Sequence, residues 1–177
     1  MNVCEPGQNR NVAALSITFM CGGFLYYMTQ DETFMNKALK QAELAFLADE
    51  VPVGCVIVKD GKIIARARNK RETLSEPTAH AEMIAIRKAA KVLGDWQLVG
   101  CTLYVTIEPC IMCAGTIIQS RVSKVVYGAP NSKGGAFGSS INVLEAKDLN
   151  HYPEVVGGIL LDDCVEIVKR YFKSKRK

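Results

Sequence analysis

Residues 76–82 read Glu-Pro-Thr-Ala-His-Ala-Glu, and residues 108–113 read Glu-Pro-Cys-Ile-Met-Cys. These stretches contain one imidazole, two thiols and a carboxylate that can bind a metal or carry protons: His80, Cys110, Cys113 and Glu82. Three nitrogen and sulfur ligands without a fourth are typical of a catalytic zinc site, in which the open position holds water. A single residue separates Glu82 from the histidine, so its carboxylate is the natural proton partner of that water. We therefore expect the fold to bring the two stretches together around one zinc ion.

The first stretch is predicted to begin a helix. Thr78 can cap a helix over residues 79–91, and Gly94 is suited to end it. His80 and Glu82 are two residues apart, which is about 200° around a helix, so they do not share a side face. Both can approach one metal ion only if it lies near the end of the helix.

The second stretch is predicted to follow a strand at residues 101–106 and to open another helix at Pro109. Cys110 and Cys113, three positions apart in the first turn, would share a face. Two helix N-termini directed at one point would stabilise thiolate anions and a metal-bound hydroxide. The alternative is that two buried cysteines and a capped helix match this pattern by chance.

Composition indicates an ordinary soluble domain. The chain has 177 residues, 49% of them hydrophobic and 23% charged, which fits one α/β domain with a sizeable core. Its seven cysteines are odd in number and follow no regular disulfide spacing. Because thiol ligands must stay reduced, we expect a cytoplasmic protein.

The order of predicted elements specifies the fold class. We expect helices over residues 31–48 and 79–91 and from about 162, and strands over 53–58, 62–67, 101–106, 124–127 and about 155–160. Asp60-Gly61 provides a hairpin turn between the first two strands. A hairpin followed by alternating strands and helices implies a mixed sheet of about five strands with helices on both faces, a three-layer α/β/α arrangement.

The N-terminal 27 residues differ from the rest. Residues 12–28 are uncharged throughout but slightly short for a membrane span, which needs about 20 residues. They lack the basic start of a secretory signal. We expect residues 1–27 to be an extension outside the domain, with Met28 as a candidate true start and residues 28–177 as the domain. A membrane anchor, or an added strand or helix on the domain, are the alternatives.

The C-terminal end is strongly basic. Six of the 22 positive charges lie there: Lys169, Arg170, Lys173, Lys175, Arg176 and Lys177. Without them the chain would have 16 positive charges against 18 negative ones. Basic residues interleaved with aromatic ones suit a phosphate backbone and unstacked bases. We expect nucleic-acid contacts from Arg170, Phe172, Lys173, Lys175 and Arg176. The alternative is a solvated tail whose cations complement the helix dipole.

From about Met28 onward the chain resembles the bacterial tRNA-specific adenosine deaminases, within the cytidine deaminase-like superfamily. The residues that carry the resemblance are 51–54, Asn69, 76–82, 103–110, 113–115, 120–121, 125–129 and 134–139. The zinc motif is shared by many nucleobase deaminases, and the flanking stretches narrow the resemblance to the tRNA branch. Glu76 stands where the family often has aspartate, and Asn131 occupies a variable loop position.

The resemblance implies a cytidine deaminase-like fold and one Zn²⁺ held by His80, Cys110 and Cys113. A zinc-bound hydroxide would add to C6 of adenine, and Glu82 would move protons first to N1 and then to the departing amine. The product would be inosine at the wobble position of a tRNA anticodon, whose unpaired base is cheap to splay into a pocket. The resemblance also implies a homodimer, and the tRNA anticodon stem-loop as its partner, with no membrane.

Asn69 and Ala81 are the substrate-binding residues that the resemblance implies. The amide of Asn69 could both donate to and accept from a purine, but the residue also suits a turn after the hairpin.

Two other functions stay open on the sequence. The first is deamination of a free base or nucleotide, such as guanine, cytosine or deoxycytidylate, without any need for the basic tail. The second is a non-catalytic, zinc-stabilised RNA-binding module. A closed structural site would need a fourth ligand, and the only other histidine, His151, is distant in the sequence.

Overall fold

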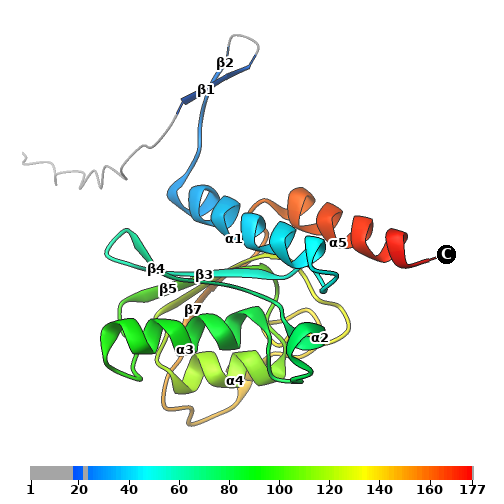
Figure 1. Cartoon of the computed structure of the whole chain (residues 1–177). Helices are drawn as coiled ribbons and strands as arrows, with labels where there is room; N and C mark the ends of the chain where they lie inside the picture. Colours follow the sequence, from blue (N-terminus) through cyan, green and yellow to red (C-terminus); the bar gives the residue numbers. More distant parts are fainter. Residues whose placement is uncertain (1–17, 22–23, 177) are drawn as a thin grey trace, which may run out of the picture.

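The computed structural model describes residues 18–21 and 24–176, and Figure 1 shows a sheet covered by helices on both of its faces. The strands are β1 (Thr18–Cys21), β2 (Phe24–Tyr27), β3 (Gly54–Lys59), β4 (Lys62–Arg68), β5 (Cys101–Ile107), β6 (Lys124–Ala129) and β7 (Glu154–Val156). The helices are α1 (Gln30–Leu47), α2 (Arg71–Leu74), α3 (Ala81–Leu93), α4 (Ile111–Gln119), α5 (Leu161–Lys175) and the short 3₁₀ helix η1 (Val143–Glu145).

The central sheet has five strands in the order β4-β3-β5-β6-β7. β3 runs antiparallel to both of its neighbours, whereas β5, β6 and β7 are mutually parallel. The connection between the parallel strands β5 and β6 contains α4. The predicted mixed five-stranded sheet is therefore confirmed.

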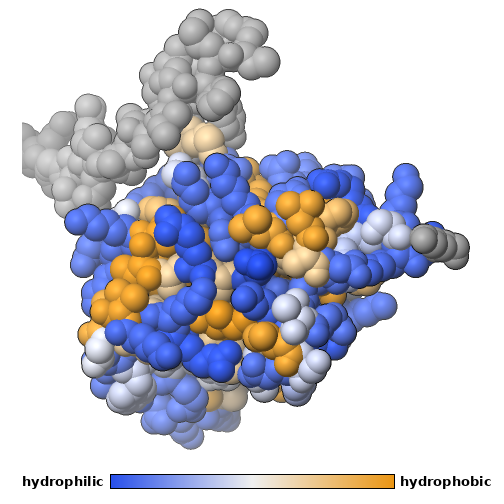
Figure 2. Space-filling model, viewed as in Figure 1, coloured by the Kyte–Doolittle hydropathy of each residue, from blue (hydrophilic) through white to orange (hydrophobic). Residues whose placement is uncertain are grey.

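Alternation along the strands builds two cores, one on each face of the sheet. On one face, Leu103 of β5 belongs to a buried cluster with Ala85 of α3 and Ala114 of α4. On the other face, the adjacent Tyr104 belongs to a cluster with Met35 of α1 and Cys164 of α5. The helices turn apolar sides to the sheet, and Figure 2 shows hydrophilic side chains separating smaller apolar areas on the outer surface.

Three sequence predictions about element boundaries are wrong. Pro109 does not open α4, which begins at Ile111, and Cys110 is the extended residue before it. Thr78 does not cap the helix that carries Glu82: its hydroxyl donates to Glu76 at 2.6 Å, and the helix begins after His80. The last strand covers only Glu154–Val156, because the glycine pair that follows it turns the chain, with Gly158 at a φ of 87°. The sequence prediction also missed α2 and η1, which are each about one turn long.

The predicted extension over residues 1–27 lies mostly outside the described residues, which include residues 18–21 and 24–28 of the uncharged segment at 12–28. Its described parts, β1 and β2, pair antiparallel with each other in a two-stranded sheet that is separate from the central one. α1 then begins with a complete capping box of its own, in which Thr29 and Glu32 exchange hydrogen bonds. No helix in the described part of the chain combines the length and apolar character that crossing a membrane requires.

Candidate active site

Three side chains from the two sequence stretches meet at the N-termini of α3 and α4. The Nδ1 atom of His80 lies 3.7 Å from the sulfur of Cys110 and 3.5 Å from that of Cys113. All three ligand atoms lie within 4.8 Å of one another. One imidazole and two thiols at this separation fit Zn²⁺, which prefers nitrogen and sulfur ligands at about 2.0–2.3 Å. The structure thus brings together the metal ligands that the sequence predicted.

The backbone explains how the ligands converge. His80 is the residue before α3, and Cys110 is the residue before α4. Both are extended, with ψ angles of 152° and 172°, so neither occupies a regular helical position. Cys113 lies in the first turn of α4, and its sulfur is close to the ligand atoms of the other two residues. Both helix dipoles therefore point their positive ends at the metal position, where they favour thiolates.

Hydrogen bonding tunes the ligands further. The bond from the Cys113 thiol and the bond to His80 lower the pKa of Cys110 to about 3, against the effect of burial. The bond to Cys110 raises the pKa of both His80 and Cys113. The two thiols thus differ in how readily they lose a proton, and metal binding favours the thiolate form of both.

Glu82 lies in the first turn of α3, and its side chain is buried, with 4% exposed. Burial raises the pKa of this carboxyl above its usual range, although the charge of His80 acts in the opposite direction. A carboxyl group with a raised pKa is closer to the operating pH and exchanges protons more effectively. Glu82 is not among the three grouped ligands, which leaves it available for proton transfer.

A cavity of about 490 Å³ opens over the metal ligands and contains the chemically active groups. Its floor includes His80, Glu82 and Cys110. Its walls come from the turn after α1, the end of β4, the loop after β6 and one side of α5: Val51, Val53, Asn69, Asn131, Lys169 and Phe172. A cavity of this size is in the usual range for a small-molecule or nucleobase site.

The structure places the two predicted substrate-binding residues differently. Asn69 lines the cavity, and it is buried, with 5% exposed. Ala81 is fully buried at the start of α3 and is not among the residues that line the cavity. Its backbone N–H lies in the first turn of the helix, where such groups have no partner within the helix.

Sequence reasoning missed Glu108, which shapes the cavity wall. This carboxylate is buried, and it accepts hydrogen bonds from the backbone N–H groups of Asn131 at 3.0 Å, Phe137 at 2.9 Å and Ser139 at 3.1 Å. A Cβ atom on Gly135 would lie 2.3 Å from its carboxylate oxygen, so only glycine permits this approach. The clue in the sequence was a glutamate beside Pro109 and ahead of a glycine-rich loop.

The predicted nucleic-acid contacts separate into two groups. Phe172 lines the cavity, and together with Lys173 and Arg176 it lines an adjoining groove of about 540 Å³. Arg170 instead bonds Glu43 of α1 at 3.0 Å, and Lys175 pairs with Asp49 after α1. Lys133 and Lys169, which the sequence prediction did not include, line both the cavity and the groove.

This fold and this site define a zinc-dependent deaminase. Residues 28–129 match the family of the cytidine and deoxycytidylate deaminase zinc-binding region.

Comparison with curated proteins narrows the family. The chain is 51% identical over 150 residues to the tRNA-specific adenosine deaminase of Bacillus subtilis (strain 168), covering 85% of this chain and 93% of that one. It is 44% identical over 151 residues to the same enzyme of Aquifex aeolicus (strain VF5), covering 82% and 95%. The chain belongs to the family of tRNA-specific adenosine deaminases.

Solved structures of deaminases also resemble this chain. A structure from a study of A-to-I editing by tRNA:A34 deaminases at the wobble position of transfer RNA is 43% identical. The match covers 76% of this chain and 98% of the chain in that structure, with a TM-score of 0.74. This similarity confirms the predicted cytidine deaminase-like fold. The guanine deaminase of Bacillus subtilis is 39% identical to this chain. That match covers 66% of this chain and 85% of the guanine deaminase, with a TM-score of 0.55.

Proposed function

We propose that this protein deaminates adenosine to inosine at the wobble position of a tRNA anticodon. The observation that carries the proposal is the cavity in which a zinc-binding triad, a buried carboxyl and a buried amide meet. Family membership, with 51% identity to a tRNA-specific adenosine deaminase, supports the choice of substrate.

Four residues of the site have a part in the proposed reaction. His80, Cys110 and Cys113 would hold the zinc ion, which would supply an activated water as the nucleophile. Glu82 would accept one proton from the attacking water and pass it to N1 of adenine, while the remaining hydroxide adds to C6. Glu82 would then take the second proton from the added hydroxyl and deliver it to the amine, which leaves as ammonia as the C6–N bond breaks. One carboxyl can serve twice because it alternates between base and acid.

The base itself would be oriented by the amide of Asn69 and by the backbone N–H of Ala81. Asn69 offers both a donor and an acceptor from the cavity wall. An unpaired anticodon base needs no extrusion from a duplex, so entry into the cavity costs little.

The groove beside the cavity is our proposed path for the RNA backbone. It is lined by Lys133, Lys169, Lys173, Arg176 and the half-exposed ring of Phe172. Cations in such a groove attract phosphates, and an exposed ring offers a surface on which a base can stack. Arg170 and Lys175 already have acidic partners, so we assign them mainly to packing α5 against α1.

The resemblance also supports a homodimer in the cytoplasm. A cytoplasmic location agrees with thiol ligands that must stay reduced. Sedimentation equilibrium of the zinc-loaded protein would show the mass of two chains if the dimer forms.

The test is incubation of the zinc-loaded protein with an anticodon stem-loop that carries adenosine at the wobble position. Parallel reactions contain free adenine, guanine and cytidine, and inosine and ammonia are measured. We expect inosine from the stem-loop and no turnover of the small molecules.

The second candidate is deamination of a free base, which the likeness to a guanine deaminase favours. Release of ammonia from guanine, with none from the stem-loop, would replace the first proposal by this one. Tight stem-loop binding without turnover of any substrate would indicate an RNA-binding module instead.

A further inference from the structure

Glu50 is a buried carboxylate that the zinc chemistry does not use. It follows the turn after α1, where Asp49 has a φ of 61°, and its side chain is fully buried. Burying an ionised carboxylate is costly unless hydrogen bonds compensate for the lost hydration. Its contacts therefore indicate what the group does.

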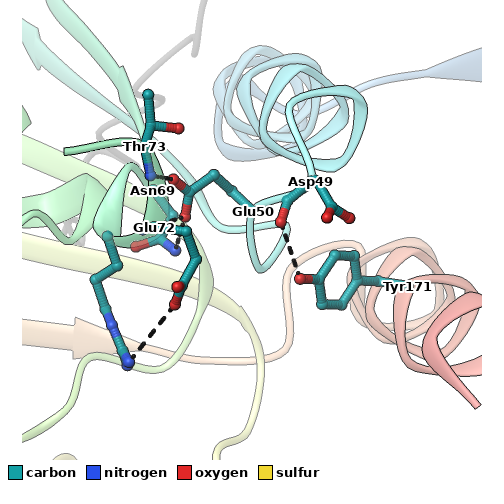
Figure 3. A network of polar contacts seen from close by, with 7 residues as sticks. Asp49, Glu50, Asn69, Glu72, Thr73 and Tyr171 are labelled. Atoms are coloured by element: carbon teal, nitrogen blue, oxygen red, sulfur yellow. Dashed lines mark hydrogen bonds and ion pairs between the residues drawn. The ribbon is translucent and has the colours of Figure 1, made fainter. Parts of the chain in front are cut away.

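The hydrogen bonds of Glu50 join it to two neighbouring segments (Figure 3). One carboxylate oxygen accepts from the side-chain Nδ2 of Asn69 at 3.1 Å and from the backbone N–H of Glu72 at 3.3 Å. The other oxygen accepts from the backbone N–H of Thr73 at 2.7 Å. The turn after α1 is thereby tied to the end of β4 and to α2.

These contacts keep Glu50 ionised. Burial by itself raises the pKa of the carboxyl, but hydrogen bonds from Thr73 and Glu72 and the charge of Arg71 bring it below the usual value. An ionised carboxylate accepts hydrogen bonds and cannot donate them. It must therefore face an N–H group of the Asn69 amide.

The consequence is a fixed amide. If the side chain of Asn69 turned by half a rotation about its last bond, its carbonyl oxygen would face the carboxylate and repel it. In the bonded orientation one N–H is occupied, while the carbonyl oxygen and the second N–H are left for a ligand. Asn69 lines the cavity above the zinc ligands.

We propose that Glu50 is a positioning residue, which fixes the amide of Asn69 in one orientation and thereby sets the donor and acceptor pattern offered to the purine. The proposal rests on the proposed function, because it takes a purine base as the ligand of the cavity. The turn that carries Glu50 is itself held from α5, since the hydroxyl of Tyr171 donates to the carbonyl of Asp49 at 3.1 Å (Figure 3).

A double-mutant cycle tests the proposal. The rate constant kcat/KM for the stem-loop is measured for Glu50→Gln, for Asn69→Ala and for the double variant. The glutamine amide has one acceptor oxygen where the carboxylate has two, so Glu50→Gln should lower kcat/KM by roughly 10–100-fold. If Glu50 acts through Asn69, it should have little further effect in the Asn69→Ala background. Losses that multiply independently would overturn the proposal.

The chain offers a matched control. Glu145 is an exposed glutamate whose carboxylate also accepts from an asparagine amide, that of Asn142, at 3.3 Å. Glu145→Gln makes the same chemical change away from the cavity, and we expect it to leave kcat/KM within about twofold of the parent protein, as is usual for surface substitutions. Zinc content and thermal midpoint, measured for every variant, separate a folding defect from a positioning defect.

A measurement on the unaltered protein needs neither a variant nor turnover. In zinc-loaded protein without substrate, the side-chain N–H signals of Asn69 are followed by NMR. We expect slow exchange with water for Asn69 and fast exchange for Asn142. Fast exchange at Asn69 would overturn the proposal. Protection at Asn69 together with no inosine from the stem-loop would reject the proposed function and leave the positioning role standing.

Discussion

At the scale of single residues, three glutamates are buried in the part of the chain that the structure describes, and their surroundings separate their roles. Glu50 and Glu108 accept hydrogen bonds from several backbone N–H groups, which outweigh the effect of burial and bring their pKa below the usual value. Burial dominates at Glu82 and raises its pKa. The first two are thus suited to hold chain segments in place as fixed anions, and the third to carry a proton.

The role of Glu82 can be separated from metal binding by substitution. Glu82→Ala should keep one zinc per chain and lose roughly 10²–10⁴-fold in kcat, because the proton transfers lose their carrier. His80→Ala, the control at a ligand, should lose zinc and stability as well, since metal binding is coupled to folding. Zinc is measured by elemental analysis and turnover by inosine formation. Normal deamination by Glu82→Ala would show that another group carries the proton.

Glu108 should matter for the loop that it holds. Glu108→Gln replaces an acceptor of three backbone N–H groups by one with a single oxygen, so at least one buried N–H loses its partner. We expect a loss of about 1–3 kcal/mol in the free energy of unfolding. Urea denaturation of the zinc-loaded protein measures this loss, and exposed Glu145→Gln serves as the control. Equal stability of the two variants would contradict the anchoring role.

At the scale of elements, the contact between α1 and β3 is unusually close. A Cβ atom on Gly54, the first residue of β3, would lie 2.0 Å from the carbonyl oxygen of Ala38 and 2.4 Å from the nitrogen of Ala42. Both atoms belong to the helix backbone and cannot move aside alone. The glycine therefore determines how near α1 can approach the sheet.

Gly54→Ala should destabilise the protein by about 1–3 kcal/mol or more, since it overpacks this contact. Gly115→Ala is the matched control: a Cβ there meets no heavy atom within 4 Å, and it lies inside α4. Alanine inside a helix should raise stability by roughly 0.5–1 kcal/mol. Thermal unfolding measures both variants, and a Gly54→Ala protein as stable as its parent would show that α1 can shift.

α5 combines packing and binding on different sides. Tyr171 is buried and contacts Phe46 of α1 edge-on, with ring centroids 6.0 Å apart, whereas Phe172 is 47% exposed beside the groove. The cations at this end of the chain divide in the same way. Arg170 and Lys175 have acidic partners near α1, whereas Lys169, Lys173 and Arg176 line the groove.

Two double variants of α5 and of Arg176, the residue after it, test this division with equal changes of charge. Lys173→Gln with Arg176→Gln should weaken stem-loop binding and lower the log–log salt slope by roughly one unit per lost phosphate contact. Arg170→Gln with Lys175→Gln removes the same charge and should leave the slope nearly unchanged. Binding is measured by fluorescence anisotropy at several salt concentrations. Equal slopes for the two variants would remove the groove from RNA binding.

At the scale of the whole molecule, the central sheet does not include β1 and β2, which pair with each other. Removing residues 1–27 keeps the capping box of α1, because Thr29 and Glu32 remain. We expect the shortened protein to bind zinc, to unfold at the same temperature and to deaminate at the same rate. Gel filtration, calorimetry and the stem-loop reaction measure these properties. Aggregation or lost activity would make the N-terminal segment part of the domain.

From the sequence alone, both the fold class and the three residues that the structure groups as a candidate zinc site could be predicted. His80, Cys110 and Cys113 could be recognised because metal binding demands particular side-chain types at particular spacings. The strands and the helices could be placed because burial imposes periods of about 2.0 and 3.6 residues, which are local properties of the chain.

Only the tertiary structure decided the rest. Thr78 matched the pattern of a cap, yet it lies in a turn, and His80 is extended ahead of the helix, where its imidazole lies near two sulfur atoms from the start of α4. Glu50 meets Asn69 across 19 positions of sequence, and Arg170 meets Glu43 across 127. The partners of a buried carboxylate or a surface cation depend on segments that approach one another only after folding. Local periodicity and residue spacing therefore cannot predict which of these segments come into contact.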